Sequence, residues 1–246
     1  DSGPVARAAH DFGGLLDALA DAACGMAASF KPQELTNMLW SYATLKQRHS
    51  RLFEVLGESA ASRMAEFTPQ GISQTVWSFA KLWSYKVWIY SGKGSKGAAP
   101  ETCLGRSRAA LLQAAVGAAL PRLASFDPVS ISALAWGFAN LEVEDAPLLS
   151  AICQQATARP SAFDAASAAQ LLWALAKLEE GVDREAISAM ARRLTQLAAA
   201  GLAPQQLQYA LGALGKLGPA GLGSGLGSVL CTCAAKAAPT LAPIKL

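Results

Sequence analysis

The sequence has little of the chemistry on which enzymes and metal sites depend. Its 246 residues include two histidines, His10 and His49, and five cysteines, none of them in a C-x-x-C pair. Metal sites usually need closely spaced cysteine and histidine ligands, and general acid–base catalysis most often uses histidine. No nucleophile, base and orienting group occur at a recognisable spacing. We therefore predict no catalytic residue, no metal ligand and no cofactor, and the odd, irregularly spaced cysteines favour free thiols.

Charge and long apolar runs are scarce as well. Charged residues make up 16% of the chain, whereas apolar residues make up 52%, enough for a continuous core and unlike a disordered chain. The apolar residues are mainly alanine and leucine, both strong helix formers. They are never uninterrupted for about 18 residues, so we predict no membrane span.

The few charges are unevenly distributed. Residues 81–108 contain six basic residues and one acid, a net charge of +5; because the whole chain carries +3, the remainder is at −2. A concentrated basic segment is typical of an anion-binding surface, although a solvated linker is the simpler alternative.

What the sequence does contain is a repeat. Five similar segments cover residues 30–45, 67–82, 126–141, 163–178 and 202–217. Trp40, Trp77, Trp136 and Trp173 mark the first four at intervals of 37, 59 and 37 residues, and Gly212 takes the tryptophan position 39 residues later. A 37-residue unit with one 22-residue insertion accounts for these intervals. Repetition at this period predicts an all-α fold, a right-handed α-solenoid of antiparallel helix pairs with about five repeats of 37–39 residues.

This repeat also sets the expected domain boundaries. We expect a partial leading helix over 12–30, the solenoid over 31–217 with an insertion near 87–108, and a Gly/Ala-rich cap or tail over 218–246. In the leading helix the apolar spacing predicts an inward face. That face comprises Leu15, Leu16, Leu19, Ala23, Met26, Ala27 and Phe30.

Proline and aspartate predict where the helices of each unit begin and end. Pro32 and Pro69 stand in first turns, Asp127 precedes Pro128 as a cap, and Pro121 is expected to end or kink a helix. Further helices are expected over 147–158, 164–178 and 184–199.

The repeated pattern Phe-x-Pro-Gln-x-(Leu/Ile)-(Ser/Thr)-(Asn/Gln)-x-x-Trp-(Ser/Ala)-(Phe/Tyr)-Ala-(Lys/Thr)-Leu resembles the octotricopeptide repeat family and the related heptatricopeptide repeats. The resemblance covers about residues 30–217. It implies an α-helical solenoid in a mitochondrion or chloroplast that binds RNA, either in messenger maturation, stability or translation or in an organellar ribosome. A closing RAP-type domain is not found in the sequence.

A polar or small stripe runs along the first helix of each unit, at positions 3, 7, 11 and 14 after its opening residue. Amides and an aromatic ring in this stripe suit contacts with bases, and lysines suit phosphates. We predict base contacts at Asn37, Gln74, Gln170 and Tyr209. We predict phosphate contacts at Lys81, Lys86, Lys93, Lys96, Arg106, Arg108, Lys177 and Lys216.

Each part of this stripe also has a plainer interpretation. Exposed helix faces are ordinarily polar, and small residues can simply fit a neighbouring helix. The tryptophans recur beside the leucines, so we expect them to pack in the core or between repeats rather than to stack on bases.

Together these observations predict a non-enzymatic, organellar RNA-binding protein, in a mitochondrion rather than a chloroplast. Because full units are few, we expect a structural component of a mitochondrial ribosome that binds rRNA and neighbouring proteins. The alternatives are a free organellar mRNA factor and a protein-binding α-solenoid scaffold.

Overall fold

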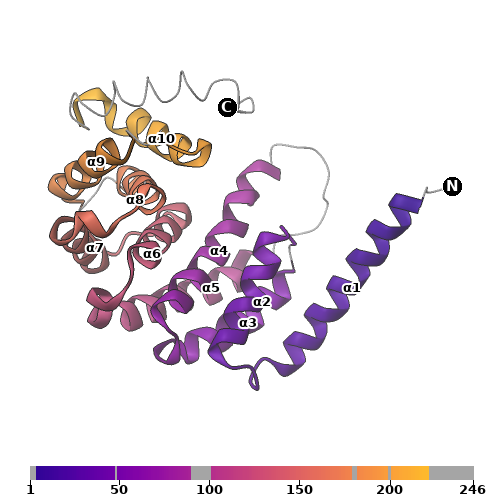
Figure 1. Cartoon of the computed structure of the whole chain (residues 1–246). Helices are drawn as coiled ribbons and strands as arrows, with labels where there is room; N and C mark the ends of the chain where they lie inside the picture. The colour runs from indigo at the N-terminus through magenta and orange to yellow at the C-terminus, as the bar shows by residue number, and fades with distance from the viewer. Residues whose placement is uncertain (1–3, 48, 90–100, 179–181, 199–200, 222–246) are drawn as a thin grey trace. The chain divides into compact units, whose positions relative to one another are not determined.

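The computed structural model describes residues 4–47, 49–89, 101–178, 182–198 and 201–221 (Figure 1). All secondary structure in these residues is helical, which confirms the all-α prediction. The chain divides into two compact units, residues 1–118 and 119–246. Within the described residues, no helix is both long enough and apolar enough to span a lipid bilayer.

The first unit contains five α-helices in its described residues. They are α1 (Pro4–Met26), α2 (Pro32–Thr44), α3 (Ser50–Ser62), α4 (Pro69–Ile89) and α5 (Glu101–Ala119), with a 3-10 turn, η1 (Met64–Glu66), after α3. Alternate helices pack together: α1 against α3, and α2 against α4, while α2 also contacts α3. Phe53 of α3 and Phe79 of α4 meet edge to face, with ring centroids 5.2 Å apart. Gly57 permits this approach, because a Cβ there would lie 2.7 Å from Phe79 Cζ.

The second unit repeats this arrangement. Its elements are η2 (Leu120–Ser125), α6 (Pro128–Leu141), α7 (Ala146–Ala158), η3 (Pro160–Ala162), α8 (Ala165–Leu178), α9 (Arg184–Ala198) and α10 (Pro204–Gly221). Helices α6, α8 and α10 lie side by side, α7 packs against α9, and α8 also packs against α9. Helix α8 thus packs against three neighbours, α6, α9 and α10, and nine of its residues are buried. At Gly212 of α10 an added Cβ would lie 2.8 Å from Trp173 Cδ1, so the indole of α8 rests directly on this glycine.

The helices begin where the sequence predicts because their first turns are capped. Pro32, Pro69 and Pro128 each occupy the first helical residue, where a missing N–H has no partner to lose. The Asp127 carboxylate accepts the Ser130 N–H at 2.6 Å. The Asp164 carboxylate accepts both the N–H and the hydroxyl of Ser167, at 2.8 and 2.5 Å. These bonds satisfy helix N–H groups that otherwise have no intrahelical acceptor.

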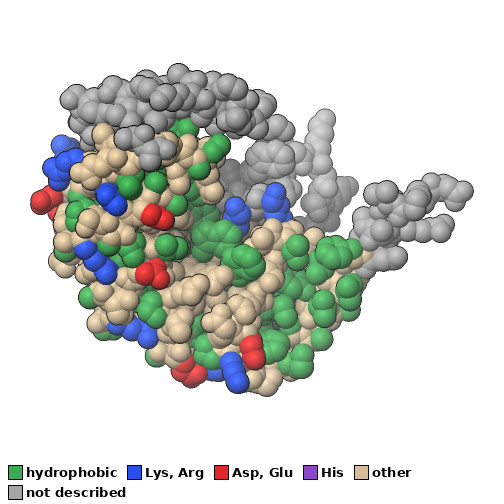
Figure 2. Space-filling model, viewed as in Figure 1, with side chains coloured by type: hydrophobic (Ala, Val, Ile, Leu, Met, Phe, Trp, Pro, Cys, Tyr) green, Lys and Arg blue, Asp and Glu red, His purple; other side chains and the backbone are tan. Residues whose placement is uncertain are grey.

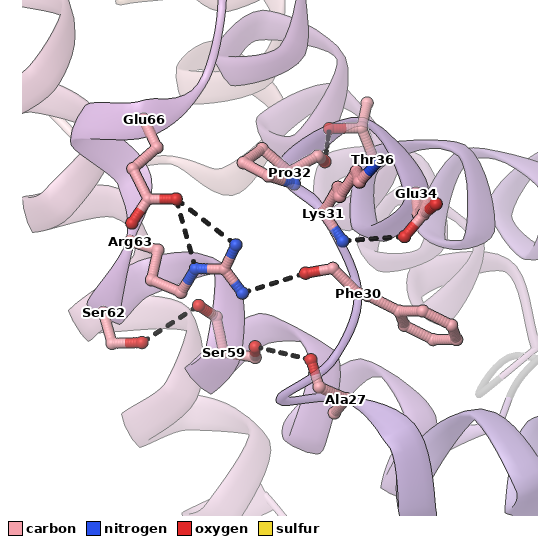
Figure 3. A network of polar contacts seen from close by, with 10 residues as sticks. All are labelled: Ala27, Phe30, Lys31, Pro32, Glu34, Thr36, Ser59, Ser62, Arg63 and Glu66. Carbon is pink, nitrogen blue, oxygen red and sulfur yellow. Dashed lines mark hydrogen bonds and ion pairs between the residues drawn. The ribbon is translucent and has the colours of Figure 1, made fainter.

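Three arginines, at the ends of α3 and α7 and within α9, each hold the start of their own repeat. Arg63 Nη1 donates to the Phe30 carbonyl at 2.9 Å, Arg159 Nη2 to the Phe126 carbonyl at 2.7 Å, and Arg193 Nε to the Phe163 carbonyl at 2.9 Å. Figure 3 shows the first of these bonds, with Glu66 on the other side of the Arg63 guanidinium. We call these three bonds the arginine clamps. The clamps occur in both compact units of the chain. A charged donor makes each of these hydrogen bonds stronger than a bond from a neutral donor.

Two predictions about the first unit are wrong in part. Helix α1 begins at Pro4 and ends at Met26 rather than covering 12–30, and Leu15, Leu19 and Met26 are exposed instead of inward. The face that does pack holds Leu16, Ala20, Ala23 and Ala27. The described apolar side chains of α1 therefore include both a buried set and an exposed set.

The expected insertion near 87–108 is helical at both of its ends. Residues 87–89 continue α4, and residues 101–108 already belong to α5. Residues 90–100 lie outside the part of the chain that the structure describes. Pro121 falls in the 3-10 turn that follows α5, as the sequence predicts for a helix end.

The predicted tail at 218–246 is described only at its start. Helix α10 runs to Gly221 and is kinked at Gly218, where φ is 69°. Glycine adopts this left-handed conformation without steric cost.

Candidate nucleic-acid interface

In the first unit, the predicted site residues lie on neighbouring helices α2 and α4. Asn37 is exposed on α2, where its side-chain oxygen accepts a hydrogen bond from Gln33 Nε2 at 3.0 Å. Gln74 is half-buried on α4, and Lys81, seven residues further along the same helix, is also half-buried. Because α2 packs against α4, the two amides and the cation lie on adjacent helices.

A lysine over a tryptophan is the arrangement that recurs between the two units. Lys81 Nζ lies 5.5 Å from the centre of the Trp77 ring, and Lys177 Nζ lies 5.6 Å from the centre of the Trp173 ring. In both pairs the lysine follows the tryptophan by four residues, so the two side chains share a helix face. All four residues are partly exposed. Each pair therefore presents a positive charge beside an aromatic surface.

The third position of the stripe is mostly buried. Ser78, Gly137, Ala174 and Ala213 are all buried at this position, and Ser41 is half-buried. The Ser78 hydroxyl donates to the Gln74 backbone carbonyl at 2.7 Å, within its own helix. At the four buried positions the plainer interpretation holds, because the small residues fit neighbouring helices.

In the second unit, three aromatic rings form a row across α6, α8 and α10. The Trp136 and Trp173 centroids are 6.4 Å apart, and those of Trp173 and Tyr209 are 5.9 Å apart. Trp136 is buried at 6% exposure, whereas Trp173 and Tyr209 are partly exposed. This row confirms that Trp136 and Trp173 pack between repeats. Trp40 behaves differently, since it is 40% exposed and is not a core residue.

Burial changes the acidity of Tyr209. It raises the pKa of the phenol above its ordinary value, and side-chain hydrogen bonds from Gln205 and Trp136 oppose this by lowering the pKa. The Tyr209 ring thus packs against Trp173, and its hydroxyl group is held by the hydrogen bonds with Gln205 and Trp136. Its remaining exposed surface is the part that a base could reach.

Two lysines and a glutamate meet at the ends of α6, α8 and α10. Lys177 Nζ lies 3.7 Å from a Glu142 carboxylate oxygen. Burial lowers the Lys177 pKa, Glu142 raises it, and the nearby positive charge of Lys216 lowers it further. We call Glu142, Lys177 and Lys216 the lysine cluster. Its net charge is positive, so it suits an anion.

The other predicted residues are placed less fully. Gln170 is half-buried on α8, and Arg108 is half-buried on α5. Lys93 and Lys96 lie outside the residues that the structure describes, as do the side chains of Lys86 and Arg106. The basic insertion therefore stays a prediction.

Glu142 and the arginines of the clamps are contacts in the structure that were not predicted from the sequence. Glu142 follows the repeated segment directly, as Glu179 does in the fourth segment, but it lies outside the stripe positions from which the site residues were predicted. Two of the arginine clamps had a signal, since Arg63 and Arg159 each stand four residues before the next opening phenylalanine, a spacing that Arg193 does not share. No group of three or more His, Cys, Asp or Glu side chains in the described residues is placed to hold a metal ion.

Comparison with protein-family models finds no match to this chain, and comparison with curated proteins finds none either.

Proposed function

We propose that this chain is an α-solenoid that binds RNA through its first-helix layer: helices α2 and α4 in one unit, and α6, α8 and α10 in the other. The packing of alternate helices in each unit supports this architecture, since stacked helix pairs produce two such layers. The repeat pattern of the sequence supports it independently.

The recurring lysine–tryptophan pair carries the proposal. Nucleic acids present phosphates, which attract ammonium groups, and bases, which stack on aromatic rings. A partly exposed Lys–Trp pair supplies both at one place, and here it occurs at equivalent positions 96 residues apart, Trp77–Lys81 and Trp173–Lys177. Lys216 adds a second cation beside the latter.

The RNA that we propose is ribosomal RNA, in a mitochondrial ribosome. The resemblance to octotricopeptide repeats supports an organellar RNA, and a net charge of +3 with few repeats favours a stable constituent over a free reader of long messenger sequences. A free mRNA factor is the nearest alternative within the same function.

The first experiment compares the unmodified chain with a triple variant, Lys81→Ala, Lys177→Ala and Lys216→Ala, in binding a 20-nucleotide oligouridylate. We expect the slope of log affinity against log salt to become shallower by about 2, because each lost phosphate contact removes roughly 0.7 for a single strand. The control is Arg184→Ala with Arg192→Ala, two exposed residues of α9 in the other layer. Equal effects in the two variants would contradict the proposal.

The second experiment identifies the RNA. The native protein is crosslinked to RNA in cells, fractionated by size, and the attached RNA is sequenced. Ribosomal RNA from one site in a ribosome-sized fraction is the expected result. Messenger fragments in small complexes would support the mRNA factor, and RNA at background level would refute RNA binding.

A second candidate function, a protein-binding scaffold, is favoured by one observation. Phe12, Leu15, Leu19 and Met26 are exposed along α1, and Figure 2 shows hydrophobic side chains gathered over this region. Contiguous exposed apolar surface is typical of protein interfaces. Binding there would be nearly independent of salt and would be lost in Leu15→Asp with Leu19→Asp, whereas RNA binding would not.

A further inference from the structure

We infer that Glu142 acts as a built-in competitor for the phosphate that the lysine cluster binds: its carboxylate occupies Lys177 in the free protein and is displaced when a nucleic-acid phosphate arrives. This rests on the proposed function for the identity of the ligand. The competition itself rests on the geometry of the cluster.

The first observation is the ion pair. Glu142 and Lys177 are 3.7 Å apart, and the carboxylate side chain is 77% exposed while the lysine is only 21% exposed. The lysine is therefore fixed against Trp173, and its anionic partner stands on the solvent side. An ion pair with so exposed a member contributes little in water. An incoming phosphate can replace it without a large loss.

The second observation is the backbone of Glu142. It caps the end of α6 with φ 55° and ψ 43°, in the left-handed region that favours glycine. A positive φ recurs at the equivalent position of two other repeats, at Lys46 with φ 58° and at Gly218 with φ 69°, so the backbone conformation is the ordinary helix end of these repeats and what is particular to Glu142 is its carboxylate. Here the left-handed cap places the carboxylate at Lys177 of the neighbouring helix.

The third observation is the second lysine. Lys216 on α10 is exposed and close enough to Lys177 to lower its pKa. Together the two lysines carry +2, and Glu142 reduces this to +1. A phosphate in contact with both lysines would take the place of the single carboxylate charge, with Trp173 as the wall behind it.

The test compares Glu142→Gln with Glu144→Gln. Glu144 is also exposed and lies two residues further on, so both variants remove one negative charge from the same region. At 0.1 M salt we expect Glu142→Gln to bind the 20-nucleotide oligouridylate about fivefold more tightly than the unmodified chain, because no carboxylate then has to be displaced from Lys177. Glu144→Gln is expected to change the affinity by less than about twofold, since exposed charges are screened over roughly 10 Å at this salt.

A second pair of variants checks that the gain passes through Lys177. In a Lys177→Ala background the Glu142→Gln change should no longer tighten binding, because the group that it frees is absent. Equal tightening by Glu142→Gln and Glu144→Gln would overturn the inference, as would a gain that survives Lys177→Ala.

Inorganic pyrophosphate separates this inference from the proposed function. Its titration is followed by the NMR signal of the Lys177 ε-methylene, assigned with Lys177→Arg. If no variant binds the oligouridylate, RNA binding fails, but a pyrophosphate shift at Lys177 that is larger in Glu142→Gln than in Glu144→Gln still supports the competitor. No shift in either variant, or equal shifts in both, would overturn the competitor.

Discussion

Arg192 and Arg193 stand next to each other on α9 but differ in what they contact. Arg193 donates to the Phe163 carbonyl at 2.9 Å and to the Ser161 carbonyl at 3.1 Å, whereas Arg192 is exposed. Hydrogen bonds from charged groups contribute about 1.5–3 kcal/mol, so we expect Arg193→Ala to lower the free energy of unfolding by about 2 kcal/mol. Arg192→Ala should stay within about 0.5 kcal/mol. Denaturant unfolding of both variants measures these changes. Similar losses of unfolding free energy in the two variants would show that the arginine clamp does not stabilise the folded state.

Asp164 predicts a dependence of stability on pH. The Ser167 hydroxyl, and then its N–H, holds the pKa of Asp164 below its ordinary value of about 3.9. A carboxyl whose pKa is lowered by folding stabilises the folded state above its unfolded pKa, and this contribution is lost as the pH falls through the folded pKa. We therefore expect the unmodified chain to be more stable than Asp164→Asn at pH 7, with the difference beginning to decrease at about pH 4 and lost as the pH falls through the folded pKa.

Equilibrium unfolding of both proteins at pH 7, 5 and 3 measures this difference. Ser167→Ala is the matched control, because it removes the hydroxyl donor and keeps the carboxylate. It should move the Asp164 pKa, followed by NMR, back toward the ordinary value. A constant difference between the two proteins across the pH range would contradict the prediction.

At the scale of whole helices, α8 and α1 are opposites in burial. Leu172 of α8 is fully buried, whereas Leu19 of α1 is exposed. Leu172→Ala should cost about 2–5 kcal/mol of unfolding free energy, because it removes buried apolar atoms and leaves a cavity. Leu19→Ala should cost less than about 0.5 kcal/mol. If Leu19→Ala proves equally costly in denaturant unfolding, the apolar face of α1 is covered in solution.

The helices most closely predicted from the sequence are those with strong start and stop residues. Helix α7 was expected over 147–158 and is found at Ala146–Ala158, and α9 was expected over 184–199 and is found at Arg184–Ala198. Helix α5 begins inside the predicted insertion, because the glycine and lysine composition before it hides its first turns. The prediction of which α1 side chains face inward was wrong in part, because the apolar periodicity defines an apolar face of the helix but not which part of that face meets a neighbouring helix. In the same way, the sequence placed Lys177 and Lys216 on a common stripe, but the approach of Glu142 depends on how α6 and α8 pack, which the repeat pattern does not encode.

At the scale of the whole molecule, the two compact units should differ from single helix pairs in their ability to fold. The unit 119–246 encloses its own core, including Phe126, Ile131, Phe138 and Phe163. We expect a fragment of residues 119–246 to be helical and to unfold cooperatively, since neighbouring pairs stabilise each other in a solenoid. A fragment of residues 126–163, with one pair, should not fold. Circular dichroism during denaturation tests both, and a non-cooperative transition in the longer fragment would contradict the prediction.

The glycine in α10 has a consequence for how such a chain can be rebuilt. A consensus design would restore tryptophan at position 212, where the other four units carry it, yet even a methyl group there would lie 2.8 Å from Trp173 Cδ1. Helix α10 is therefore shaped to follow one particular neighbour. The fifth repeat is not interchangeable with the others: any repeat that carries tryptophan at this position would clash with Trp173 if it took the place of α10.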